Sequence, residues 1–186
     1  MNHTSPPEPP PRLAPEETFP SYSYVTGRFP HPTRDPQGHS FWHVATAAPA
    51  IDPEHWADSR EYLFGCDLFN YGYYWEAHEL WESSWKACGR TGTTANLLKG
   101  LIKLAAAGVK AREGRVAGVQ RHATRAAELF ASVRSHTGSD HYLGLSLARL
   151  IAVAQTLQAH PAVRPVSDGP VELVFGFHIV PRSSKD

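Results

Sequence analysis

His78, Glu79 and Glu82 are the residues of this sequence best placed to carry chemistry. His78 and Glu82 stand four residues apart, so a helix brings them to one face, where Glu79 can join from the rim. Imidazole nitrogen and carboxylate oxygen are ligands that divalent metals accept. The pair could also act as an acid–base couple, because the carboxylate fixes the imidazole tautomer. The structural alternative is a histidine packed under tryptophans and bonded to Glu82.

Further ligands must come from outside this helix, because two ligands do not complete a metal site. The segment before residue 53 offers His31, Asp35, His39 and His43. Their spacing fits no metal-binding motif, and a role as polar turn residues is the alternative. The candidate metal ligands are His78, Glu82, His31 and His39, with Glu79 as a ligand or general base.

Other side chains are expected around this cluster. Trp75 and Trp85 flank it on the same predicted helix, and Lys99 and Lys103 follow on the next one. The lysines could neutralise an anionic substrate, although lysines more often form a solvated face or pair with acids. His122, further along the chain, is a candidate for a side chain that reaches inward.

The prolines divide the chain into parts. Seven of the 16 prolines fall in residues 1–20, and none falls in residues 54–160. Because proline breaks helix interiors at a cost of ~3 kcal/mol, we expect one helical domain over residues 53–160. Residues 1–20 are expected to form a disordered tail, and residues 21–52 an ordered aromatic arm without regular structure. Residues 161–186 are expected to be an extended tail, with residues 22–29 as its only plausible strand partner.

Apolar periodicity and capping signals predict an all-α bundle of about five antiparallel helices. The expected ranges are 53–70, 73–88, 94–112, 115–135 and 141–159. The first starts at the capping pair Asp52-Pro53, and the last follows Ser139-Asp140.

The second predicted helix carries the candidate site. At about 100° per residue, Tyr74, Ala77 and Trp81 fall in one buried stripe, and His78 lies at its edge. Glu76 falls on the side opposite His78, so we expect it to face solvent or a basic side chain.

Charge and motifs exclude several functions. Residues 51–90 carry eight acids and three bases, and residues 91–138 carry eight bases and two acids, so internal pairing explains the basic part better than nucleic-acid binding does. No apolar stretch approaches the ~20 residues of a membrane helix. No phosphate-binding loop is present, and we expect no nucleotide or flavin cofactor. Cys66 and Cys88 are expected to be reduced core residues of a cytoplasmic protein.

Two segments, 68–85 and 97–107, closely resemble the domain-of-unknown-function 309 family. That family has an FNxGxYxxAHExxExxW helix hairpin and a downstream LxGLIxLAAA helix. The resemblance covers roughly residues 60–130 and leaves the arm and tail outside. It implies a compact all-α bundle of bacterial or archaeal type. It also implies the family's label of predicted metal-dependent hydrolase, which rests here on His78, Glu79 and Glu82.

A second likeness is to tetratricopeptide hairpins. Gly72, Tyr74, Ala77 and Trp81 occupy the positions that pack two helices closely around a tight turn. The first two helices are therefore expected to form a close antiparallel pair.

Two functions of different classes stay open on the sequence. One is a metal-dependent hydrolase with a divalent metal. The other is a non-catalytic interaction or scaffold protein in which the His–Glu–Trp cluster is structural. A homo-oligomer fits either one, and no other partner is indicated. A third acid or histidine within ~5 Å of His78 and Glu82 would favour the enzyme, and a His78 sealed beneath Trp75 and Trp85 would favour the scaffold.

Overall fold

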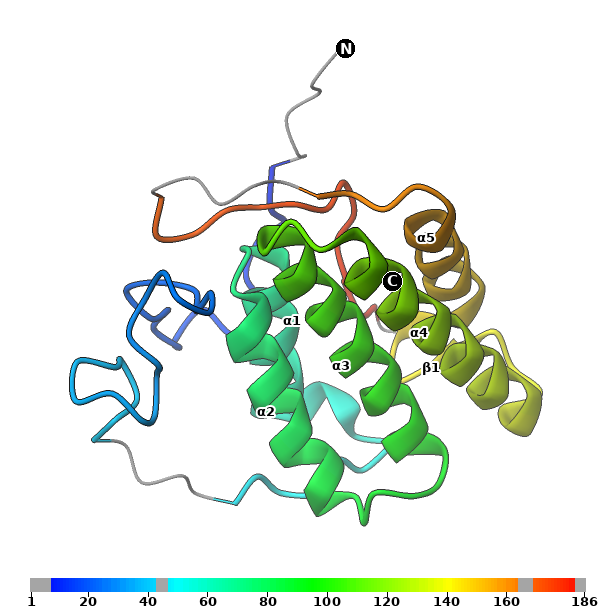
Figure 1. Cartoon of the computed structure of the whole chain (residues 1–186). Helices are drawn as coiled ribbons and strands as arrows, with labels where there is room; N and C mark the ends of the chain where they lie inside the picture. Colours follow the sequence, from blue (N-terminus) through cyan, green and yellow to red (C-terminus); the bar gives the residue numbers. More distant parts are fainter. Residues whose placement is uncertain (1–7, 43–46, 164–168, 183–186) are drawn as a thin grey trace.

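The computed structural model describes residues 8–42, 47–163 and 169–182. This part of the chain is mostly helical (Figure 1), and the prediction of an all-α bundle is confirmed. A short 3-10 turn, η1 (Trp56–Asp58), precedes the first helix, and a hairpin of two-residue strands, β1 (His141–Tyr142) and β2 (Leu145–Ser146), precedes the last. The helices are α1 (Arg60–Asn70), α2 (Tyr74–Ala87), α3 (Thr93–Arg112), α4 (Val116–Thr137) and α5 (Leu147–Ala159).

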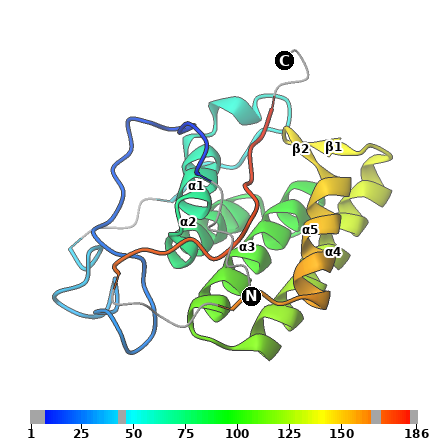
Figure 2. The ribbon, with the colours of Figure 1, turned by 90° about the horizontal axis from the view of Figure 1, so that it is seen from above.

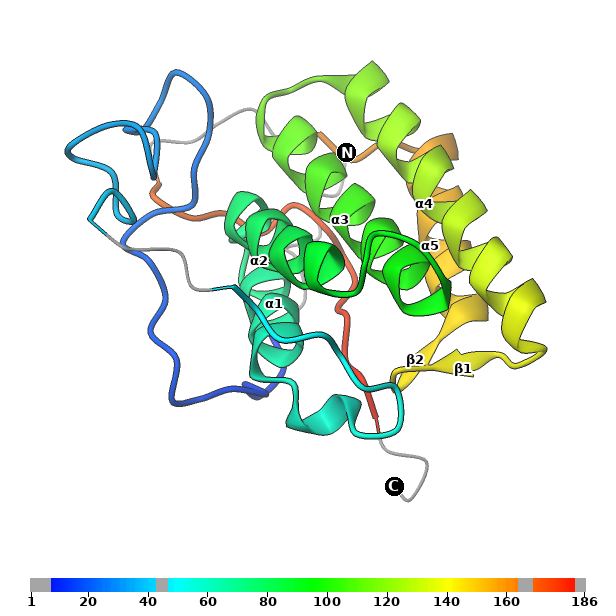
Figure 3. The same cartoon turned by 90° about the horizontal axis from the view of Figure 1, so that it is seen from below.

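The third helix lies at the centre of the bundle. Figure 3 shows α3 between α2 and α4, with α5 packed on α4 and α1 on α2. Small residues allow these close contacts, because a Cβ atom at Gly108 would collide with the ring of Tyr74, and one at Gly100 would collide with Phe130. Gly108 and Gly100 therefore allow α2 and α4, respectively, to pack close to α3.

The turn between α1 and α2 sets the direction of the site helix. Gly72 adopts a φ of +91°, which favours glycine, and the Tyr73 N–H donates to Leu68 O at 2.8 Å. A Cβ atom at Gly65 of α1 would collide with the indole of Trp81 on α2. The two helices thus form the close antiparallel pair that the sequence predicts.

Two buried polar side chains of α1 hold extended segments of the chain. Asp67 accepts the N–H groups of Leu13 at 2.8 Å and Ala14 at 2.9 Å. Asn70 donates to Ile179 O at 2.9 Å and accepts from Ile179 N at 2.7 Å. Residues 8–20 therefore lie against the helices, where proline content predicts a disordered tail; residues 1–7 lie outside the described residues.

The C-terminal segment crosses the molecule from the side of the arm to the side of the β1–β2 hairpin (Figure 2). It is extended, and residues 169–182 contain no strand. Residues 22–29 are its predicted strand partner. Among the described residues, one backbone hydrogen bond joins the two segments, from Ser23 N to Pro170 O at 2.9 Å. Phe175 anchors it in the core with 1% exposure, against Phe69 and Tyr74.

Two predicted helix starts are wrong. Asp52 caps a turn by accepting from Glu54 N at 3.0 Å, but the chain becomes extended at Ser59, so α1 begins at Arg60. The last helix begins at Leu147 instead of His141, because Leu143 and Gly144 have φ values of 46° and 74° and turn the chain into the hairpin.

No helix of the described ranges is long and apolar enough to cross a membrane. Cys66 and Cys88 are both free. Burial raises the pKa of the Cys66 thiol well above its usual value, so this thiol stays protonated inside the core.

Candidate functional site

His78, Glu79 and Glu82 come together on α2. His78 Nδ1 lies 3.1 Å from Glu79 Oε1 and 4.0 Å from Glu82 Oε2. One ligand atom from each side chain lies within 4.8 Å of the other two. The side chains are 29%, 48% and 32% exposed, respectively. The group could therefore hold a metal ion at the surface, with positions left open to solvent.

The buried stripe of α2 fixes the direction of these side chains. Tyr74, Ala77 and Trp81 are almost fully buried, as the helical spacing predicts. His78 follows at the margin of this stripe and is partly exposed. It is not sealed beneath Trp75 and Trp85, which are themselves only partly buried.

Charge favours the ionised form of Glu79. The hydrogen bond to His78 lowers the pKa of this carboxyl group, and the charges of His78, Lys86 and His31 act in the same direction. Glu82 is held by Lys86, whose Nζ lies 2.9 Å from Glu82 Oε1. The spacing of Glu82 and Lys86 is itself a sequence signal for this pair. Lys86 is half exposed, so it can release the carboxylate to another cation.

His31 lies near the cluster without joining it. Its ring packs edge-on against Trp75 at 5.8 Å and beside Tyr24 at 5.1 Å. Its Nδ1 accepts from Thr33 N at 3.3 Å, within the turn. It is nevertheless one of the groups that lower the pKa of Glu79. His31 therefore stands at the rim of the site, and Asp35 caps a turn by accepting from Gln37 N.

Glu76 corrects the expectation of a solvent-facing side chain. It is 6% exposed and accepts from Tyr24 N at 2.8 Å and from Ser23 Oγ at 3.0 Å. His39 Nε2 lies 3.1 Å from Glu76 Oε1 and its Nδ1 lies 2.8 Å from Ser40 Oγ. The arm covers the side of α2 that carries Glu76, so His39 pairs with Glu76 instead of approaching His78; His43 lies outside the described residues.

The lysines of α3 divide between two roles. Lys99 Nζ lies 5.4 Å from the ring centre of Trp85, in a cation–π contact. Burial lowers the pKa of His122 on α4, and the charge of Lys103 acts in the same direction. Helix α3 lies between α2, which carries the cluster, and α4, which carries His122, while Trp75 packs against the arm.

His122 gives a pH-dependent prediction. Burial, followed by the charges of Lys103 and Arg121, lowers its pKa to about 4. The unfolded chain, with the ordinary histidine pKa of ~6.5, takes up this proton first, so stability falls as pH decreases from about 6.5 to about 4. We expect His122→Gln to reduce the loss of unfolding free energy between pH 7 and pH 5 by about 1–2 kcal/mol, after discounting for partial exposure. Urea unfolding of both proteins at each pH measures this difference, and equal losses would contradict it.

Three buried polar side chains hold extended segments of the chain, and they were not predicted from the sequence. Asp67, Asn70 and Arg112 are each 1% exposed and hold extended segments in place. Arg112 donates to Ser23 O at 3.3 Å. The available signal was a polar residue at a position where the helical pattern requires an apolar one.

Comparison with known proteins bears on the segment that carries the site. No curated protein matches the chain. Residues 62–122 match the sequence model of a family described as Domain of unknown function (DUF309). This segment runs from α1 through α2 and α3 into α4, and it contains His78, Glu79 and Glu82. The resemblance of the chain to the DUF309 family is thereby confirmed over residues 62–122.

Proposed function

We propose that this protein is a metal-dependent hydrolase that holds one divalent cation at His78, Glu79 and Glu82. The observation that carries this proposal is the convergence of three ligand atoms within 4.8 Å of one another. Nitrogen and carboxylate oxygen form a donor set that suits Zn²⁺ and neighbouring divalent ions. Such an ion supplies an activated water at neutral pH.

Each side chain has a distinct role in the proposal. His78 presents Nδ1 toward both carboxylates, so this nitrogen would hold a divalent cation together with them. Glu79 is ionised because its pKa is lowered. Glu82 would hold the cation once its ion pair with Lys86 opens. Where Glu79 does not ligate, its exposed carboxylate accepts a proton as general base.

The surroundings support an anionic substrate. Lys103 of α3 is partly buried, and no acidic partner is found for it among the described residues. Lys110 is paired with Glu113 at 2.6 Å, so it contributes less free charge. We infer that Lys103 attracts the negative group of the substrate, with Lys99 on the same face held against Trp85.

The contacts of His78 favour this function over a scaffold in which the cluster is structural. A structural histidine is expected to bond to another element of the fold. The polar partners of His78 among the described residues, Glu79 and Glu82, lie on its own helix. Among the described residues, the side chain of His78 therefore forms no hydrogen bond that links α2 to another element.

The protein is freed of metal by chelation and then supplied with Zn²⁺ or Mn²⁺. Its hydrolysis of p-nitrophenyl acetate, p-nitrophenyl phosphate and bis(p-nitrophenyl) phosphate tests the proposal. We expect metal-dependent turnover of an anionic ester that falls by about 100-fold in Glu79→Gln. Loss of a general base costs about 10²–10⁴ in rate, and loss of a charged oxygen ligand weakens metal binding. His136→Ala is the matched control. This exposed histidine lies in the last turn of α4, and the variant should keep full activity. Turnover that is independent of metal, or unchanged in Glu79→Gln, contradicts the proposal; metal binding without turnover of any ester would favour the scaffold.

A further inference from the structure

A cavity lies at the β1–β2 hairpin, away from the metal cluster. Its volume is about 560 Å³, within the range of small-molecule sites. Its walls come from η1, the hairpin, α5 and the C-terminal segment, and none comes from α2, α3 or α4. It is therefore separate from the His78 cluster, and a ligand in this cavity would bind whether or not that cluster holds a metal.

Specific bonds hold the walls of this cavity together. Arg182 N donates to Gly144 O at 2.8 Å, which ties the C-terminal segment to the hairpin turn. Tyr62 of α1 donates its hydroxyl to Leu143 O at 2.8 Å. Gly144 packs so closely on the ring of Trp56 that a Cβ atom there would lie 2.5 Å from Cζ2. The shape of the cavity is thus set by the fold itself.

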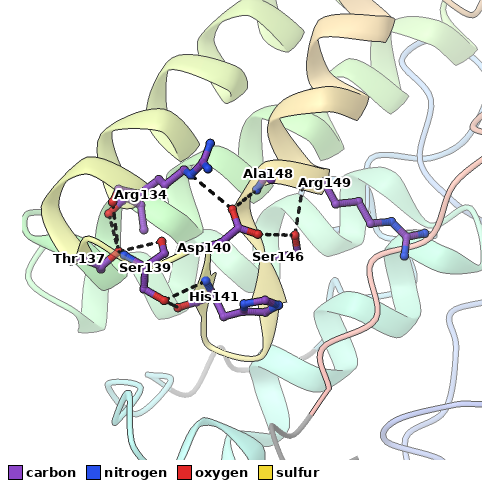
Figure 4. Close-up of polar contacts among 9 residues, drawn as sticks. Arg134, Thr137, Ser139, Asp140, His141, Ser146, Ala148 and Arg149 are labelled. Atoms are coloured by element: carbon purple, nitrogen blue, oxygen red, sulfur yellow. Dashed lines mark hydrogen bonds and ion pairs between the residues drawn. The ribbon is translucent and has the colours of Figure 1, made fainter.

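Asp140, next to the hairpin, already has hydrogen-bond and ion-pair partners within the fold. Its carboxylate accepts from Ser146 Oγ at 3.0 Å and Ala148 N at 2.9 Å, and it pairs with Arg134 Nε at 3.3 Å (Figure 4). Ser146 Oγ in turn accepts from Arg149 N at 3.3 Å. The acid and the hydroxyl that cap α5 are therefore satisfied, and no aspartate or glutamate of the described residues lines the cavity.

The cationic side chains of the cavity lack such partners. Arg149 and Arg182 line it, and neither has an acidic partner in the described part of the chain. In Figure 4 the side chain of Arg149 extends away from the Asp140 network and toward the C-terminal segment. His178 Nε2 is buried and has no hydrogen-bond partner among the described residues. Burial and the Arg149 charge lower the pKa of His178, so its ring is neutral at pH 7 and can donate one N–H.

Much of the remaining wall is apolar, and His141, Tyr142 and Ser146 contribute polar atoms to it. Trp56, Leu150, Val153 and Phe177 line the same space. We propose that this cavity binds a small anion with an apolar body, in which an aromatic or branched group carries a phosphate or a carboxylate. Arg149 and Arg182 bind the charged group, since the guanidinium fork matches phosphate and carboxylate oxygens. His178 donates to the same group, and Trp56 and Phe177 cover the apolar body.

Calorimetric titration of the full chain with phenyl phosphate and with benzoate tests the proposal. Inorganic phosphate and benzyl alcohol serve as comparison probes, because each keeps one half of the required chemistry. We expect one site per chain for at least one of the aromatic anions, with a Kd below ~1 mM and binding at least about tenfold tighter than for either comparison probe. Failure of both aromatic anions to bind, or binding no tighter than that of inorganic phosphate, overturns the proposal.

Substitutions locate the site. Arg149→Gln and Arg182→Gln should each weaken binding of the aromatic anion by about tenfold or more, the usual effect of losing a charge-assisted hydrogen bond. Both side chains are exposed and neither forms a hydrogen bond or ion pair with the described residues, so folding should be retained. Arg28→Gln, at an exposed arginine of the arm, is the matched control and should bind as the wild type does. Equal affinity in all three variants would place the anion elsewhere and overturn the assignment.

Discussion

Glu76→Ala should destabilise the fold by about 3 kcal/mol and release the arm from α2, because it leaves buried partners of a carboxylate unpaired. Tyr24 N, Ser23 Oγ and His39 Nε2 all lose the oxygen that they contact, and Ser23 is 1% exposed. Urea unfolding followed by circular dichroism measures the loss, and limited proteolysis reports cleavage within residues 21–42. Glu76→Gln keeps one carbonyl acceptor, so its free energy of unfolding should lie between those of the wild type and Glu76→Ala.

Glu128→Ala is the matched control for this prediction. Glu128 is an exposed acid of α4 paired with Arg125 at 2.6 Å. An exposed pair contributes about 0–1 kcal/mol, so this substitution should change unfolding little. A Glu76→Ala protein as stable as Glu128→Ala, with an uncleaved arm, would contradict the view that Glu76 fastens the arm.

The second large effect is expected at the metal cluster. His78→Ala removes the one nitrogen ligand, and Glu82→Gln replaces a charged oxygen ligand with a weaker neutral one. Loss of a residue that merely supports a ligand already costs 10–100-fold in metal affinity. We therefore expect His78→Ala to lower Zn²⁺ affinity by at least about 100-fold, measured as metal retained after equilibrium dialysis. His136→Ala should retain as much metal as the wild type, and equal retention in His78→Ala would contradict the ligand assignment.

Local patterns predicted the helices well, for physical reasons. Buried positions recur at helical spacing on α2 because one face of the helix packs on the core, so the predicted burial of Tyr74, Ala77 and Trp81 is confirmed. The cluster of His78, Glu79 and Glu82 was predictable for the same reason, because it depends only on spacing within one helix.

Features that depend on distant segments were not predictable in this way. Periodicity places Glu76 away from the buried stripe of α2, but it does not show that the arm covers Glu76 and buries it. The anchoring of Leu13 by Asp67 joins residues far apart in the sequence. The cavity at the hairpin is likewise built from η1, α5 and the C-terminal segment, which no local pattern connects. His39 was a reasonable ligand candidate by type, and its pairing with Glu76 follows from the path of the arm.

Isothermal titration of Zn²⁺ into the metal-free protein tests the central claim most directly. The account predicts one ion per chain in the wild type and in His136→Ala, and loss of that site in His78→Ala. Cys88→Ser, which removes the partly exposed thiol, should leave the site unchanged. Absence of a Zn²⁺ site in the folded wild type, or a site that survives in His78→Ala, would contradict the claim that His78, Glu79 and Glu82 hold a divalent cation.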